Sequence, residues 1–301
     1  MIPAVNRVVT AAGKPVHVRR HGSPLHAPTV VICAAMGAVC TDWDAVLALL
    51  PDVDLVVFDR PGTGHSPPAA PAWPDAAPLG LTEEVQRVDE VCQAVGAAPP
   101  YVLVGHSSGG LLAQAFARLR PAQTAGVVLV DSSLPRPAPP RRTQPEAQRL
   151  LRAAARTSLP GVVAPVLRRL LVWTQTDHAT DPLSPAARKR IYGSPAVGRA
   201  IVAELLAFHG TAHELASLAR THPFPRIPTA VLAAGRTGHP LRRRTRSSVR
   251  EQAALARYLG AGAVHRIDDA AHLVPLDRPD AIAEKIRAAL RAVHHGGRTR
   301  G

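Results

Sequence analysis

The segment Gly105–Gly110, of sequence GHSSGG, holds a serine, Ser107, with a glycine two residues to either side. The apolar run Tyr101–Val104 precedes this segment, and the mostly apolar stretch Gly110–Leu119 follows it. A serine on a strained strand-to-helix turn exposes its hydroxyl, and glycine is needed where a side chain would collide with the neighbouring strand or helix. The pattern predicts that Ser107 is a nucleophile and that Ser108 has a supporting position.

Three further segments, by their order and spacing relative to this turn, indicate a family resemblance. They are Asp59–Ser66 (DRPGTGHS), Gly126–Asp131 and Ala271–Leu276 (AHLVPL). With them the chain resembles the α/β-hydrolase family, over nearly all of its length. The resemblance implies the α/β-hydrolase fold, a serine hydrolase activity and a catalytic histidine in the loop before the last helix. Among the 14 histidines of the chain, His272 occupies that loop.

The acid that should orient this histidine is where the chain departs from the family pattern. Most relatives carry the acid after the strand that follows the lid, and Gly238 stands there in this chain, with no Asp or Glu between residues 215 and 250. Asp131 ends the strand that follows the nucleophile helix, and a subset of the family supplies its acid from that strand end. We therefore expect Asp131 to orient His272, whereas Asp268 and Asp269 are too close to His272 in the sequence.

Two backbone N–H groups must bind the oxyanion that forms during acyl transfer. One should belong to Ser108, the residue after the nucleophile. The other should come from the loop after the strand that ends at Cys33, and we assign it to Met36, with Ala35 as the alternative. Ala35 and His65 are expected to line the site. A plain strand-to-helix loop is the competing interpretation of residues 34–37.

The elements that must position these residues alternate along the chain. Predicted strands are 15–19, 29–33, 55–58, 101–104, 126–130, 229–233 and 264–267, and helices separate most of them. Such alternation predicts a mostly parallel sheet with helices on both faces. Residues 1–133 and 225–301 should form this core, and a helix near 83–95 should begin with Thr82 as its N-cap.

Residues 134–224 contain no convincing strand and should form an inserted helical lid, with helices near 146–157, 162–173 and 196–219. The lid has apolar residues at helical spacing, including Leu167, Leu170, Leu171 and Trp173. We expect most of them to pack inside the lid or against the core, and some, such as Trp173, to line the substrate pocket. An uncharged, fairly hydrophobic ester is the expected substrate.

The composition limits the possible partners. The formal net charge is +14, but the arginines are mostly scattered apart from the cluster Arg242–Arg246, so we expect no nucleic-acid partner. No apolar run is long enough to span a membrane. We recognise no secretory signal, and Cys33, Cys40 and Cys92 have no metal-ligand spacing, which favours free thiols and a cytoplasmic location. No cofactor or metal motif is found.

Other activities remain possible for this sequence. Carbon–carbon or cyanohydrin lysis and cofactor-free perhydrolysis use the same scaffold, and fold similarity does not separate them from ester hydrolysis. The missing acid at Gly238 also leaves open a ligand-binding protein without catalysis. Epoxide hydrolysis and dehalogenation are disfavoured, because those relatives have aspartate at the position of Ser107.

Overall fold

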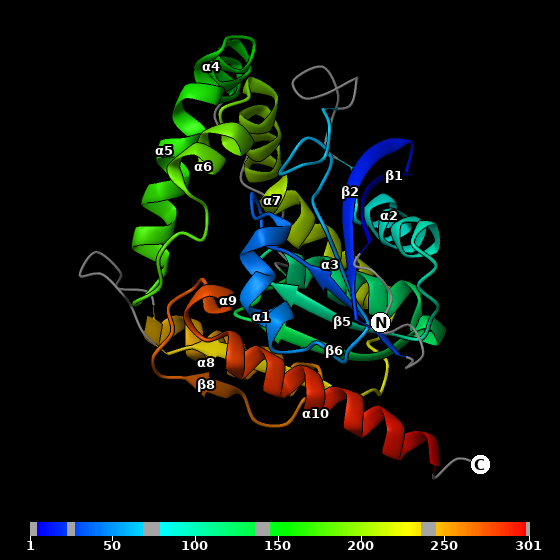
Figure 1. Cartoon of the computed structure of the whole chain (residues 1–301). Coiled ribbons are helices and arrows are strands. Elements are labelled where there is room, and N and C mark those ends of the chain that lie inside the picture. Colours follow the sequence, from blue (N-terminus) through cyan, green and yellow to red (C-terminus); the bar gives the residue numbers. More distant parts are fainter. Residues whose placement is uncertain (1–4, 23–27, 69–78, 136–144, 236–244, 299–301) are drawn as a thin grey trace.

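The protein is built on a twisted central sheet, seen in a computed structural model that describes residues 5–22, 28–68, 79–135, 145–235 and 245–298. Within these residues the strand order is β1-β2-β4-β3-β5-β6-β7-β8. Strands β3 to β8 pair in parallel, whereas β1 and β2 run antiparallel to their neighbours. The arrangement confirms the predicted α/β-hydrolase fold (Figure 1).

The strands are β1 (Val5–Ala11), β2 (Lys14–His21), β3 (Thr29–Cys33), β4 (Leu55–Phe58), β5 (Tyr101–His106), β6 (Thr124–Val130), β7 (Thr229–Ala234) and β8 (His265–Ile267). The α-helices are α1 (Asp44–Ala48), α2 (Leu81–Ala94), α3 (Gly109–Leu119), α4 (Pro145–Ala155), α5 (Leu159–Gln175), α6 (Pro185–Tyr192), α7 (Pro195–Thr221), α8 (Thr245–Tyr258), α9 (Val274–Asp277) and α10 (Pro279–Arg298).

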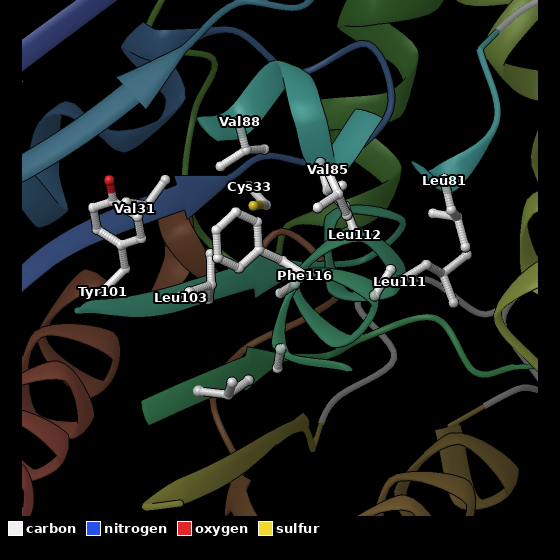
Figure 2. Close-up of a cluster of buried hydrophobic side chains, with 14 of the residues drawn as sticks. Val31, Cys33, Leu81, Val85, Val88, Tyr101, Leu103, Leu111, Leu112 and Phe116 are labelled. Carbon is white, nitrogen blue, oxygen red and sulfur yellow. The ribbon is translucent and has the colours of Figure 1, made fainter. Parts of the chain in front are cut away.

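The sheet is covered on both faces because alternate residues of its strands point to opposite sides. On β3, Val31 and Cys33 face the apolar cluster that includes α2, α3 and α8, whereas Val30 and Ile32 face the cluster that includes α1 and α10. Figure 2 shows Phe116 of α3 between strand residue Leu103 and the α2 helix. Packing on both faces fixes the position of each strand along its axis. It therefore fixes where the side chain at the end of each strand lies.

Helices α4 to α7 all fall between β6 and β7 in the chain, and together we call them the helical segment. In Figure 1, α4, α5 and α6 stand apart from the sheet, whereas α7 leads back to pack on α3. The division into a core and a lid remains a prediction. Within the described residues, no single helix has both the length and the apolar character to cross a membrane; α6 and α7, which meet at an angle of 73°, pass that test only as a pair.

Three local features differ from the sequence-based expectations. Strand β1 was not expected, because Asn6, Arg7 and Thr10 interrupt its apolar pattern, and α6 was not expected either. Helix α2 begins at Leu81 with Gly80 as its N-cap, so the prediction of Thr82 as the cap is wrong. The physical reason is tertiary: a carboxylate from α7, that of Glu214, accepts the Leu81 N–H at 2.9 Å and replaces a local cap.

Candidate active site

Ser107 lies on the turn between β5 and α3 and has a φ of +53°, a left-handed conformation that is uncommon for a residue with a side chain. A Cβ atom added at Gly109 would lie 2.0 Å from the Cys33 carbonyl oxygen, and one at Gly105 would lie 2.6 Å from the Cα of Gly110. The glycines of the motif therefore permit close contact with β3 and α3. The Ser107 N–H donates to the Val130 carbonyl at 3.1 Å, which ties the turn to β6.

The side chains of Ser107, His272 and Asp131 form one hydrogen-bonded line. The Ser107 Oγ lies 2.9 Å from the Nε2 of His272. The other ring nitrogen of His272, Nδ1, lies 2.6 Å from the Oδ2 of Asp131. In the tautomer with the proton on Nδ1, the ring donates to the carboxylate and presents Nε2 as the acceptor of the serine proton.

Asp131 is held in place by groups other than the histidine. Its φ is +38°, and its N–H donates to the Leu232 carbonyl at 2.8 Å. The Oδ1 atom accepts the N–H of Ala234 at 3.2 Å, which leaves Oδ2 for the imidazole. Asp268 and Asp269 instead pair with Arg266 and Arg278. Gly238, the position where most relatives have the acid, is outside the described residues.

The histidine before the nucleophile supports the loop of His272. His106 is buried, and its Nε2–H donates to the His272 carbonyl at 2.8 Å. Burial, together with the nearby His272, lowers the pKa of His106 to about 3. His106 is therefore neutral at physiological pH and acts as a fixed hydrogen-bond donor beneath the site.

The buried His106 predicts a specific loss of stability in mild acid. The unfolded chain takes up a proton at this histidine near pH 6.5, whereas the folded protein does so only near pH 3. Below pH 6.5 the unfolded state binds more protons, so the free energy of unfolding should fall by about 1.4 kcal/mol per pH unit from this group. Urea unfolding between pH 7.5 and 4.5 measures the slope. A His106→Gln variant should have a shallower slope, and equal slopes in the two proteins would contradict the assignment.

The loop of residues 34–37 lies against the start of α3. The N–H of Met36, the expected oxyanion donor, donates to the Ser108 Oγ at 2.8 Å. Ser108 begins α3 as its N-cap, where helix N–H groups and the positive end of the helix dipole favour negative charge. Ala35, the alternative donor, is buried, and its carbonyl accepts the N–H of Ala38 at 3.1 Å. The geometry therefore brings Met36 and Ser108, rather than Ala35, face to face.

Three side chains that sequence reasoning missed hold this loop. Glu204 of α7 accepts the Gly37 N–H at 3.1 Å and the Nη1 of Arg60 at 2.9 Å. The Nη2 of Arg60 donates to the Ala34 carbonyl at 2.6 Å, and the hydroxyl of Tyr192 donates to the Gly37 carbonyl at 2.8 Å. The available signal was a single carboxylate within the otherwise apolar run 201–208 of α7. Burial raises the pKa of Glu204, although Arg60 and the Gly37 N–H oppose the shift.

Removal of the Glu204 carboxylate should loosen the loop and leave Arg60 without its charged partner. Breaking a fully buried pair costs about 3–5 kcal/mol. The Arg60 and Glu204 side chains are 19% and 20% exposed, so we expect Glu204→Ala to cost about 2 kcal/mol of unfolding free energy. Because small displacements of positioning groups can cost up to about 100-fold in rate, we expect kcat for an aryl ester to fall about 10-fold.

The matched control for this variant is Glu214→Ala. Glu214 lies on the same helix, and its carboxylate also accepts a backbone N–H, but at the start of α2 rather than at residues 34–37. We expect Glu214→Ala to lower stability without changing kcat. Equal effects of the two variants on kcat would show that Glu204 has no particular role at the loop.

A pocket of about 90 Å³ lies beside the Met36 and Ser108 residues. Apolar side chains from α2, α3 and α7 line part of it, among them Leu112 and Phe208. The charged side chains Arg60, Glu84 and Glu204 add polar groups to a lining that is mostly apolar. One water molecule needs about 10–15 Å³ of such space, so the pocket has room for a group of only a few heavy atoms.

The three residues expected to contact substrate, Ala35, His65 and Trp173, do not line this pocket. The His65 ring is 3.6 Å from the Oδ2 of Asp59, and this carboxylate raises the pKa of His65. Trp173 is 61% exposed on α5, so the expectation that the apolar residues of the lid are mostly packed is wrong for this helix. The exposed side chains also include Leu167, Leu170 and Leu171, because α5 buries a different face.

Asp59 is the centre of a buried polar cluster below the Arg60 turn. The Nδ1 of His17, the Sγ of Cys40 and a carboxylate oxygen of Asp59 all lie within 4.8 Å of one another, an arrangement that could hold a metal ion. Asp59 already accepts hydrogen bonds from His17 and from the backbone N–H groups of Cys40 and His65. Although burial alone would raise it, these bonds hold the pKa of Asp59 below its usual range. Cys33, Cys40 and Cys92 are free and buried.

Comparisons with known proteins agree with this architecture. The family model described as "Alpha/beta hydrolase family" matches residues 21–285. The chain is 33% identical over 120 residues to the lipase LipV of Mycobacterium tuberculosis, a match that covers 39% of this chain and 42% of LipV. It is 36% identical over 124 residues to the polyketide synthase ThaQ of Burkholderia thailandensis, which covers 40% of this chain and 6% of ThaQ. The matches thus span less than half of the length of either relative.

The fold is shared with solved structures over nearly the whole chain. A thermophilic esterase from Thermogutta terrifontis superposes with a TM-score of 0.66 and 23% identity, over 97% of this chain and 100% of the esterase. At this level of identity the likeness supports the fold alone. Because the family model extends over most of the sequence and the sheet order agrees with it, the chain belongs to the alpha/beta hydrolase family.

Proposed function

We propose that the protein is a serine hydrolase that cleaves a carboxylic ester through an acyl-enzyme on Ser107. The observation that supports this most is the continuous line from Asp131 through His272 to Ser107, with separations of 2.6 and 2.9 Å. Distances of this size permit direct proton transfer between hydroxyl and imidazole. The lipase LipV among the relatives is consistent with an ester as substrate.

In this proposal the serine proton moves to the Nε2 of His272 while the Ser107 Oγ attacks the ester carbonyl. The oxyanion takes the N–H groups of Met36 and Ser108, so the Met36 N–H must leave the Ser108 hydroxyl to which it now donates. The protonated imidazole then gives its proton to the departing alcohol. A water activated by the same imidazole releases the acid and restores the serine.

The size of the pocket suggests which part of the ester it takes. A space of about 90 Å³ beside the proposed oxyanion site accommodates only a short acyl group or a small alcohol. The larger part of the substrate must then extend out of this pocket. We keep an uncharged ester as the substrate class. Both terminal nitrogens of Arg60 already donate hydrogen bonds, one to Glu204 and one to the Ala34 carbonyl, so this cation is not free to bind a charged substrate group.

A fluorophosphonate probe tests the nucleophile directly, since it forms a stable bond with an activated serine. We expect one equivalent of label, found by peptide mass mapping on the peptide that contains Ser107. Hydrolysis of p-nitrophenyl esters with acyl chains of two to twelve carbons should then favour the short chains. Cleavage of cyanohydrins without ester turnover would support lysis instead, and tight ligand binding with neither labelling nor turnover would support a binding protein.

A further inference from the structure

Helix α5 exposes most of its large apolar side chains. The exposed set, each between 38% and 68% exposed, comprises Leu159, Val162, Val163, Val166, Leu167, Leu170, Leu171 and Trp173. These positions recur every three or four residues and form one stripe along the helix. The opposite face, which is buried, contains Gly161, Ala164, Arg168 and Val172. A helix at the surface of a globular protein normally has the reverse arrangement.

The orientation of α5 is fixed by specific contacts on its buried face. Arg168 donates to Asp42 through both terminal nitrogens, at 3.0 and 2.5 Å, and also to Asp181 at 3.1 Å. A Cβ atom at Gly161 would lie 2.5 Å from the Gly193 carbonyl oxygen, so the helix is packed closely there. Rotation of the apolar stripe towards the protein would break the buried ion pairs. The stripe therefore faces outward, at the outer edge of the molecule in Figure 1.

Positive charge accompanies this stripe without negative charge. Residues 149–176 contain five arginines and no Asp or Glu. Arg149, Arg152, Arg156 and Arg169 are exposed, and only Arg168 is buried. Leu150 and Leu151 of α4, next to Arg149 and Arg152 in the sequence, are exposed as well. An exposed apolar stripe with Trp and Leu, bordered by arginine, is the composition of helices that lie in the surface of a membrane.

One end of the stripe is next to the proposed active site. Gln175 lies two residues after Trp173, and its carbonyl accepts the N–H of Leu273 at 2.8 Å. Leu273 is the residue after His272. The N–H of Asp177 then donates to Asp277 at 2.8 Å, which fastens the same end of α5 to the loop of the histidine. A surface that binds along α5 would therefore lie close to the reacting groups.

We propose that the exposed face of α4 and α5, from Arg149 to Trp173, binds an anionic lipid surface and directs the active site towards esters dissolved in it. The second half of this proposal rests on the proposed function. A second copy of the chain fits the face less well, because pairing of the same surfaces would bring the arginines of both copies together with no carboxylate between them. The stripe would contact the acyl region and the arginines the anionic headgroups.

Flotation with large unilamellar vesicles tests the binding in the Ser107→Ala protein, which does not consume ester lipids. We expect binding to vesicles of 70% phosphatidylcholine and 30% phosphatidylglycerol, at least 10-fold weaker binding to pure phosphatidylcholine, and weaker binding at high salt. Trp173 provides a second readout, since its emission should shift to the blue on binding, and Trp173→Phe should remove this shift. Of the two other tryptophans, Trp43 is buried and should not respond, and Trp73 is replaced by Phe in all the proteins compared, so that only Trp173 reports.

Val166→Gln/Leu170→Gln should weaken binding to anionic vesicles at least 10-fold, because both side chains lie on the stripe. The control is Leu49→Gln, which changes an exposed leucine on another element and should bind as the parent does. All of these side chains are exposed, so the unfolding temperatures should stay close to that of the parent. Absence of vesicle binding by the parent, or equal weakening by the control, would overturn the proposal. A dimer in light scattering that the stripe variant abolishes would assign the face to a second copy.

Activity measurements separate this proposal from the proposed hydrolysis. In the background with Ser107 intact, the stripe variant should hydrolyse a dissolved p-nitrophenyl ester as the parent does, and an ester dispersed in anionic vesicles at least 10-fold more slowly. If the parent hydrolyses the dissolved ester but does not bind the vesicles, only the lipid proposal is contradicted. Vesicle binding without any hydrolysis contradicts only the proposed function.

Discussion

Ser107→Ala should lower kcat for a short p-nitrophenyl ester by about 10⁴-fold or more, because removal of a serine nucleophile leaves only the contribution of binding and the oxyanion donors. The variant should still fold. The turn keeps the hydrogen bond that the N–H of residue 107 donates to the Val130 carbonyl and the one that its carbonyl accepts from the Ser133 N–H, since both involve only backbone atoms of residue 107. The side chain loses one hydrogen bond, to His272. Initial rates measured with the unfolding temperature distinguish a chemical defect from a folding defect.

The control for this experiment is Ser158→Ala. Ser158 is exposed before α5, and its side chain does not cap the helix. We expect parental kcat and parental fluorophosphonate labelling in this variant. If Ser107→Ala retained activity within 10-fold of the parent, or were still labelled, another group would have to be the nucleophile.

Asp131→Asn should produce the next largest loss, about 10³- to 10⁴-fold in kcat, as in serine proteases that lose the corresponding carboxylate. The physical reason is the tautomer of the imidazole. An amide can donate to the Nδ1 of His272, which favours the proton on Nε2, and Nε2 then cannot accept the proton of Ser107. KM should change much less than kcat, because in the structure Asp131 contacts His272 and backbone atoms of β7, not the pocket.

Asp268→Asn and Asp269→Asn are the matched controls, since these carboxylates are near His272 in the sequence but pair with surface arginines. Both variants should keep kcat within a factor of about two, the effect usual for surface substitutions. A loss in either variant as large as that of Asp131→Asn would assign the acid elsewhere. Equal kcat in Asp131→Asn and the parent would show that the Asp131 carboxylate is not needed to orient His272.

The oxyanion loop illustrates how far residue types can lead without coordinates. The resemblance to the α/β-hydrolase family indicated Met36 as a donor, and the loops of parallel strands gather at one edge of the sheet, which agrees with that position. The contact that bears on this prediction is a hydrogen bond from the Met36 N–H to Ser108, 72 residues further along the chain. Arg60 and Glu204, which hold the loop, are 144 residues apart, and no local pattern connects them.

The apolar spacing of α5 illustrates the opposite limit. Its period predicted a helix, and residues 159–175 form one. The same period would arise from a stripe against a core or from a stripe against solvent, so the pattern alone led us to expect packing. The Arg168 ion pairs with Asp42 and Asp181 decide the rotation of the helix, and the apolar side chains face outward as a result.

The sequence by itself determined the alternation of strands and helices, the turn that carries Ser107, and Asp131 as the acid expected in place of the missing carboxylate at Gly238. These features depend on local geometry: period, glycine at crowded positions, and the ends of apolar runs. Only the tertiary structure decided which groups meet, including the 2.9 Å approach of His272 to Ser107, the anchoring of residues 34–37 and the outward face of α5. Such contacts join segments far apart in the chain. They depend on the packing of the layers, which sets the position of each helix or strand along its axis and its rotation about that axis.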